Sequence, residues 1–206
     1  MIRKITALLA AVLLVVSLGS CKQEEMPPAL TDAEAAARLQ ELVPDALCFM
    51  KLVYGEGLPA AEDAGQETTG GTRYLPVARD AAYRSVAQMK ADAEKLFSSG
   101  YLDGTLYVVL FDGYTPPSET QKNETVVSDY IDPRYKEEDG VLYVDVNFNG
   151  FEIKTEPIPQ SAAVLSGNDR EVTVRMDYSI DGEVKGNMRV RLVLENGSWL
   201  LDSPVY

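Results

Sequence analysis

The sequence predicts an α+β fold in which N-terminal helices pack on a curved antiparallel β-meander, as in cystatin-like or NTF2-like folds. Two observations support this fold class. Apolar residues recur at helical spacing before residue 100, whereas from residue 130 onward they alternate with polar residues. Asp-Gly and Asn-Gly dipeptides, which favour hairpin turns, separate the alternating segments. Such one-sided strands need a cover for their apolar face, and the helices can supply it.

The first expected element is a helical segment over residues 31–54. Thr31 and Glu34 have the spacing of a capping box, and the apolar residues that follow recur every three or four positions. Pro44 interrupts this pattern, so we expect it to kink the helix or to split it in two. Cys48 lies in the apolar run of the helix, and we expect it to be a buried, inert thiol.

Residues 55–72, GEGLPAAEDAGQETTGGT, have the composition of a flexible linker that leads into an α+β domain over residues 73–206. In that domain, Ser85 and Gln88 predict a second capping box, at the start of a helix that ends near Gly100.

Residues 101–111, YLDGTLYVVLF, are ambiguous, because YVVLF favours a strand while the expected α+β domain, with its helices first, favours a helix. We interpret them as helical. Four hairpin turns are then expected, at Asp139-Gly140, Asn149-Gly150, Asp181-Gly182 and Asn196-Gly197. A last short strand should begin at Trp199.

The N-terminus has the features of a signal peptide over residues 1–20. A short basic start precedes an apolar run of 14 residues, which would reach roughly 21 Å as a helix, less than the roughly 30 Å of a bilayer core. Leu18-Gly19-Ser20-Cys21 then resembles the bacterial lipobox. We expect cleavage before Cys21 and a diacylglyceryl thioether on its thiol, whose two fatty acyl chains, such as palmitate, make a stable membrane anchor. The alternative is an ordinary signal peptide that contains a cysteine.

This interpretation places the mature protein outside the cytoplasm, anchored to the bacterial cell membrane, with residues 21–30 as a tether. Removing residues 1–20 takes away two basic residues and no acidic ones, so the mature chain has 17 basic and 32 acidic residues and a net charge of −15. Such a charge repels nucleic acid and favours solubility or a cationic partner. If Cys21 is lipidated, Cys48 has no partner for an internal disulfide.

The chain contains no histidine. This excludes the commonest general base, every Ser-His or Cys-His nucleophile pair and most catalytic zinc sites. We therefore expect a protein without enzymatic activity, cofactor or metal. The eleven tyrosines fit half-buried sheet positions, with a sugar or peptide groove as the alternative.

Residues 145–156, DVNFNGFEIKTE, match the spacing of an EF-hand calcium loop. Their flanks lack helical character and loop position eight is Glu152, so we interpret the segment as a hairpin instead. Five acidic residues lie around the expected Asp139-Gly140 turn. They form either a solvated loop or a face that binds a basic partner. They are Asp129, Asp132, Glu137, Glu138 and Asp139.

Three segments carry a family resemblance: RYLPV at 73–77, RYKEEDGVLYV at 134–144 and WLLDSPVY at 199–206. On these patterns the chain, over about residues 72–206, resembles the IseA-type family of extracytoplasmic proteins. The resemblance implies an inhibitor of DL-endopeptidases, the cysteine peptidases that cut cell-wall stem peptides. It implies no particular contact residue, and it leaves the N-terminal helix and linker outside the match.

These observations lead to one expected function with two alternatives. The expectation is a membrane-anchored lipoprotein that binds a protein partner at the cell envelope, such as a peptidoglycan hydrolase, and inhibits it. The first alternative is a small-ligand module of the NTF2-like kind, with a pocket under the sheet. The second is an enzyme without histidine that uses Asp or Tyr as acid and base.

Overall fold

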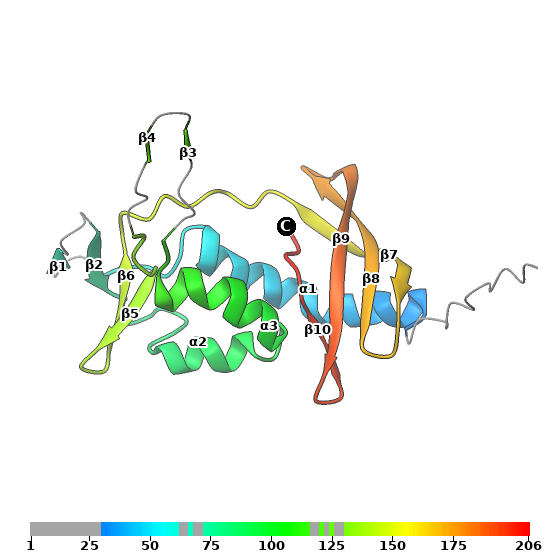
Figure 1. Ribbon diagram of the computed structural model, residues 1–206, viewed down its shortest axis with the longest axis horizontal. Coiled ribbons are helices and arrows are strands. Elements are labelled where there is room, and N and C mark those ends of the chain that lie inside the picture. The colour runs from blue at the N-terminus through cyan, green and yellow to red at the C-terminus, as the bar shows by residue number, and fades with distance from the viewer. Residues whose placement is uncertain (1–29, 62–65, 68–71, 116–119, 122–123, 126–129) are drawn as a thin grey trace, which may run out of the picture.

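The computed structural model describes residues 30–61, 66–67, 72–115, 120–121, 124–125 and 130–206 (Figure 1). It shows helices together with antiparallel sheets, so the predicted α+β class is confirmed. The helical elements are α1 (Asp32–Tyr54), α2 (Val86–Ala93), α3 (Ser99–Tyr101) and the π-helical turns η1 (Leu102–Leu106) and η2 (Val108–Asp112). The strands are β1 (Gln66–Glu67), β2 (Arg73–Pro76), β3 (Thr120–Gln121), β4 (Glu124–Thr125), β5 (Tyr135–Glu138), β6 (Val141–Asp145), β7 (Glu156–Gly167), β8 (Glu171–Ile180), β9 (Glu183–Glu195) and β10 (Ser198–Leu201).

The longer strands lie in two four-stranded sheets at opposite ends of helix α1 (Figure 1). One sheet has the order β1-β2-β6-β5, and the other is the meander β10-β9-β8-β7. The two sheets and the helices share one hydrophobic core, which the side chains of α1 enter along most of its length. A short hairpin, β3-β4, stands apart from both sheets.

Helix α1 begins as the sequence predicts. The Thr31 hydroxyl accepts a hydrogen bond from the Glu34 amide at 3.3 Å, and the Glu34 carboxylate accepts one from the Thr31 amide at 2.8 Å. The expected split at Pro44 is wrong, because the helix continues through this residue to Tyr54. Pro44 is exposed, and buried residues lie on both sides of it. Tertiary packing of both halves therefore outweighs the roughly 3 kcal/mol that an internal proline costs.

The described part of the expected linker is folded, so the prediction of flexibility is wrong for residues 55–61. Leu58 is buried, and its amide donates to the Tyr135 hydroxyl at 2.9 Å. Ala60 forms a bridge with Val77 beside strand β2. The remaining expected linker, apart from strand β1 and residue 72, lies outside the described residues.

The helical interpretation of residues 101–111 is confirmed, with the wider turns of a π-helix. Leu102, Leu106 and Leu110 bury the same side of this segment. Only half of the second capping box forms. The Ser85 hydroxyl accepts from the Gln88 amide, but the Gln88 side chain accepts from the Arg84 amide instead of the Ser85 amide. Helix α2 ends at Ala93, before the expected end near Gly100.

Three of the four predicted turns are confirmed, at Asp139-Gly140, Asp181-Gly182 and Asn196-Gly197, where both residues have positive φ. The expected hairpin at Asn149-Gly150 is wrong. Strand β6 ends at Asp145, and residues 146–155 cross between the two sheets to reach β7 (Figure 1).

None of the described helices is long and apolar enough to cross a membrane.

Candidate functional site

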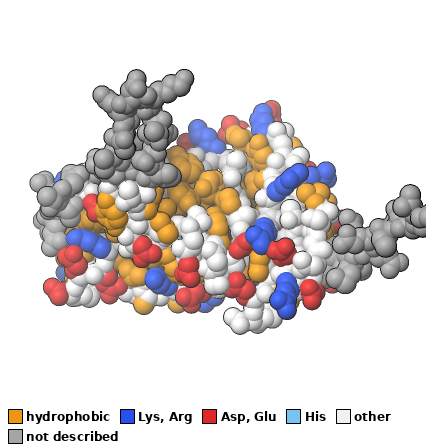
Figure 2. Space-filling view, in the orientation of Figure 1, with side chains coloured by type: hydrophobic (Ala, Val, Ile, Leu, Met, Phe, Trp, Pro, Cys, Tyr) orange, Lys and Arg blue, Asp and Glu red, His pale blue; other side chains and the backbone are white. Residues whose placement is uncertain are grey.

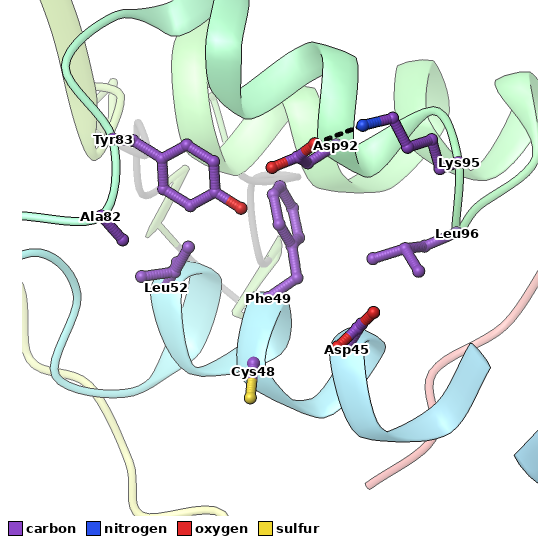
Figure 3. A pocket seen from close by; sticks show the side chains of 9 residues that line it. All are labelled: Asp45, Cys48, Phe49, Leu52, Ala82, Tyr83, Asp92, Lys95 and Leu96. Atoms are coloured by element: carbon purple, nitrogen blue, oxygen red, sulfur yellow. Dashed lines mark hydrogen bonds and ion pairs between the residues drawn. The ribbon is translucent and has the colours of Figure 1, made fainter. Parts of the chain in front are cut away.

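A groove opens between helix α1 and the segment that contains α2 (Figure 3). Its volume is about 450 Å³. Apolar side chains from both elements form its floor, since Phe49 of α1 is only 2% exposed and Leu96 is also buried, with Leu52 partly buried beside them. The residues that line the groove are Asp45, Cys48, Phe49, Leu52, Ala82, Tyr83, Asp92, Lys95 and Leu96.

Tyr83, Asp92 and Lys95 form a polar chain at one side of the groove. The Tyr83 hydroxyl donates a hydrogen bond to the Asp92 carboxylate, which also accepts from Lys95 Nζ at 2.7 Å. Burial raises the pKa of Tyr83 to about 12, and the negative charge of Asp92 adds to this effect. The hydrogen bond from Lys95 lowers the pKa of Asp92. At neutral pH the tyrosine is therefore an uncharged donor and the aspartate an ion.

Asp45 and Cys48 lie on helix α1 at the opposite side of the groove, and the Cys48 sulfur points away from the other lining side chains (Figure 3). The expectation of a buried thiol is wrong, because Cys48 is exposed. The helix buries Val43, Ala46 and Phe49, and Cys48 lies outside this stripe although its neighbours in sequence are apolar. Within the described part of the chain, Asp45 forms no ion pair.

The groove combines an apolar floor with two carboxylates and one ammonium group, and the ammonium group is already paired. This arrangement can bind a chain that carries a positive charge on an apolar stem. No imidazole is present to activate the Cys48 thiol, since the chain has no histidine. Sequence reasoning missed Asp45, Tyr83 and Asp92 as a group, because the fold brings them together from separate segments.

The acidic residues near the Asp139-Gly140 turn do not form one open face. The Asp132 carboxylate accepts from the Thr72 hydroxyl at 2.7 Å, and that of Glu137 accepts from the Val86 amide at 2.8 Å. Val86 is the first residue of α2, where a negative charge is stabilising. Glu138 pairs with Lys136 at 2.9 Å, Asp139 takes the first turn position, and Asp129 lies outside the described residues.

The segment with EF-hand spacing does not close into a loop. Asp145 ends β6 and Glu156 begins β7, so its first and last residues belong to different sheets. The Asp145 carboxylate accepts from the Asn147 amide at 2.9 Å, which makes a local turn. In the described residues, no three His, Cys, Asp or Glu side chains gather in a way that could hold a metal ion.

Cys21, the predicted lipidation site, lies outside the described residues. No protein-family model matches this chain, and no curated protein matches it either.

Proposed function

We propose that this protein is an extracytoplasmic lipoprotein, attached to the bacterial cell membrane through Cys21, that binds a protein partner at the cell envelope without catalysing a reaction. The lipobox supports the location, and the absence of histidine together with the net charge supports binding over catalysis. The packing of α1 across the meander β7 to β10 supports the finer assignment to a cystatin-like or NTF2-like fold.

The observation that carries this proposal is the α1–α2 groove, where carboxylates face an apolar floor. A lysine or arginine side chain of a partner would lay its methylene stem against the partly exposed Leu52 and bring its charge to Asp45 and Asp92. Complementary charge of this kind speeds association and selects the partner. The partner is therefore a protein with a basic surface, and the resemblance to the IseA-type family makes a peptidoglycan DL-endopeptidase the first candidate.

A wall-hydrolase assay tests the partner. We expect the purified protein to inhibit at least one DL-endopeptidase, and we expect inhibition to weaken as salt concentration rises. Asp45→Asn should weaken inhibition by about tenfold, the effect of losing one close charge pair of about 1.4 kcal/mol. Asp139→Asn, in an exposed turn on another element, is the matched control and should change nothing. Absence of both complex and inhibition across several endopeptidases would reject this partner class.

Membrane fractionation of the native cell tests the anchor separately. Cys21→Ser should release the protein from the membrane fraction or leave an uncut precursor, whereas Cys48→Ser should fractionate as the unaltered chain does. If Cys21→Ser is cut and fractionates as the unaltered chain does, the anchor is wrong, although the groove can still bind a partner.

A second candidate function is a small-ligand module, favoured by the size of the same groove. Its volume of about 450 Å³ lies within the range of about 300 to 1,000 Å³ that small-ligand sites occupy. A cationic amphiphile that raises the unfolding temperature of the protein, but not that of Asp45→Asn, would support this function. Competition between that amphiphile and the endopeptidase would show that one groove serves both.

A further inference from the structure

A second pocket lies at the C-terminal end of helix α1, where residues 146–155 cross between the sheets. Its volume is about 560 Å³. Apolar side chains and glycine backbone line one part of it, and long charged side chains line the rest. The lining residues are Lys51, Gly55, Glu56, Gly57, Phe148, Gly150, Phe151, Glu152 and Ile153.

Phe151 is a large exposed aromatic side chain, with 49% of its surface accessible, and other rings hold it in place. Tyr54 stacks on it at 5.8 Å and 23°, and Tyr206 contacts it at 5.7 Å. The Tyr54 hydroxyl donates to that of Tyr206, and the Phe151 amide donates to the Tyr54 carbonyl at 2.8 Å. Tyr206 is the last residue of the sequence, at the C-terminus that Figure 1 marks. Figure 2 shows exposed hydrophobic side chains in the same area. The ring is a fixed platform, so binding to it costs little ordering entropy.

Phe148, the second aromatic ring of the pocket, packs on a buried arginine. The Arg134 guanidinium lies 4.1 Å from the Phe148 ring centroid and donates to the carbonyls of Val53 and Gly55 at 2.7 and 2.6 Å. A Cβ on Gly150 would lie 2.3 Å from the Gly55 carbonyl oxygen, so only glycine permits this close approach. The floor of the pocket is therefore formed before any ligand arrives.

The rim of the pocket is polar. Lys51, Glu56 and Glu152 are exposed, and Glu152 makes a solvent-exposed pair with Lys154 at 3.1 Å, which contributes little energy. These side chains offer both hydrogen-bond donors and acceptors beside the aromatic platform. A ligand that fits both the aromatic platform and the polar rim is flat and apolar on one face and rich in hydroxyl or amide groups at its edge.

A pyranose ring has this shape and chemistry, because its axial C–H groups form an apolar face and its hydroxyl groups project from the edge. We propose that the pocket at the end of α1 binds a saccharide, with one sugar ring stacked on Phe151 and its hydroxyl groups bonded to Lys51, Glu56 and Glu152. This inference does not depend on the lipid anchor or on the α1–α2 groove.

Calorimetric titration of the purified full-length protein tests the proposal, with chitotriose and maltotriose as neutral probes and trilysine as a cationic one. We expect a heat of binding at millimolar concentration for at least one saccharide. Any heat with trilysine comes from the α1–α2 groove, so Phe151→Leu should leave it unchanged. Phe151→Leu keeps an apolar side chain without a planar face and should weaken binding about tenfold, whereas Phe151→Tyr should retain it. Val184→Ala, at an apolar residue on β9 that is 63% exposed, is the control and should bind normally.

Glu152→Gln separates a neutral saccharide from a cationic ligand. The amide still hydrogen bonds to hydroxyl groups, so saccharide binding should stay within about twofold, the scale of a few tenths of a kcal/mol. The proposal is overturned if neither saccharide binds, if only trilysine binds, or if Phe151→Leu binds as the unaltered chain does. Thermal unfolding of each variant confirms that it is folded before it is titrated.

Discussion

The two ends of helix α1 are held by different kinds of interaction. At the N-terminal end an exposed capping box closes the first turn, and the Asp32 carboxylate accepts from the Val164 amide of strand β7 at 2.7 Å. At the C-terminal end Arg134, only 2% exposed, donates to two helix-terminal carbonyls. The contacts at the first end are solvated, whether local or long-range, and those at the second are long-range and buried or partly buried.

This difference predicts how each end responds to change. Water can replace a solvated contact, so its loss costs little, whereas a buried donor or acceptor without a partner keeps the full cost of its desolvation. Substitutions at the C-terminal end should therefore destabilise the protein more than substitutions at the N-terminal end. The following predictions test that ranking, from the largest expected effect to the smallest.

Arg134→Met should have the largest effect. It leaves the buried Val53 carbonyl and the partly buried Gly55 carbonyl without their donor, and it removes the cation from the Phe148 ring. We expect a loss of about 3 kcal/mol in the free energy of unfolding, measured by urea titration. Arg189→Met, at an exposed arginine of β9, should stay within about 0.5 kcal/mol. Equal losses in the two variants would contradict the assignment of Arg134 as the buried cap.

Gly150→Ala should come next, with a loss of about 2 kcal/mol, because the added methyl group would overlap the Gly55 carbonyl. Gly104→Ala is the matched control. Nothing lies within 4 Å of the corresponding Cβ position in the π-helical segment, so this change should be neutral or stabilise the protein by up to about 1 kcal/mol. If Gly150→Ala leaves the free energy of unfolding unchanged, residues 146–155 can shift away from the C-terminal end of α1 at no cost.

Alkaline pH should destabilise the C-terminal end of α1. Burial raises the pKa of Tyr54 from 10.0 to about 12, and Tyr206 adds to the shift. The folded state therefore favours the neutral phenol, so this stabilisation is complete below pH 10 and is lost as pH rises through the folded value. Tyr54→Phe should make unfolding free energy fall less steeply between pH 10 and 12, as measured by urea titration at each pH. An unchanged slope would show that Tyr54 titrates as in the unfolded chain.

The N-terminal end should show the smallest effect, and on the acidic side. Thr31→Ala should cost about 1 kcal/mol as a lost N-cap. Hydrogen bonds from the Thr31 amide and then its hydroxyl lower the pKa of Glu34 below 4.5. The stabilisation from Glu34 is therefore present above pH 4.5 and disappears as pH falls through the lower, folded value. Glu34→Gln should remove this pH dependence from the free energy of unfolding in urea. If that free energy still falls with decreasing pH as steeply as in the unaltered chain, the prediction is wrong.

The sequence predicts local structure well where one rule acts alone. Strands β8 and β9 alternate over most of their length and join at Asp181-Gly182, and both the strands and the turn are confirmed. A register shift between Tyr178 and Ser179 interrupts the alternation near the turn. The capping box of α1 is confirmed for the same reason, since its two residues depend only on each other. The same holds for Asn196-Gly197, between β9 and β10.

Tertiary contacts decide the elements that sequence reasoning missed. Asn149-Gly150 has the letters of a turn, yet Gly150 is needed for close approach to α1. Strand β7 escaped prediction because Pro157 and Pro159 argue against a strand, although both are tolerated at the border of a sheet. The groove was not predicted, because its polar residues come from α1, α2 and the loop before α2. Pattern rules carry no information on such distant neighbours.

The two prolines of β7 also affect how copies of the protein meet. A strand at the border of a sheet exposes amide and carbonyl groups that can recruit a strand from another molecule. Pro157 and Pro159 have no amide hydrogen to offer, and Asp32 already occupies the Val164 amide. These three positions cannot donate to a strand of another copy, which disfavours strand addition at this border.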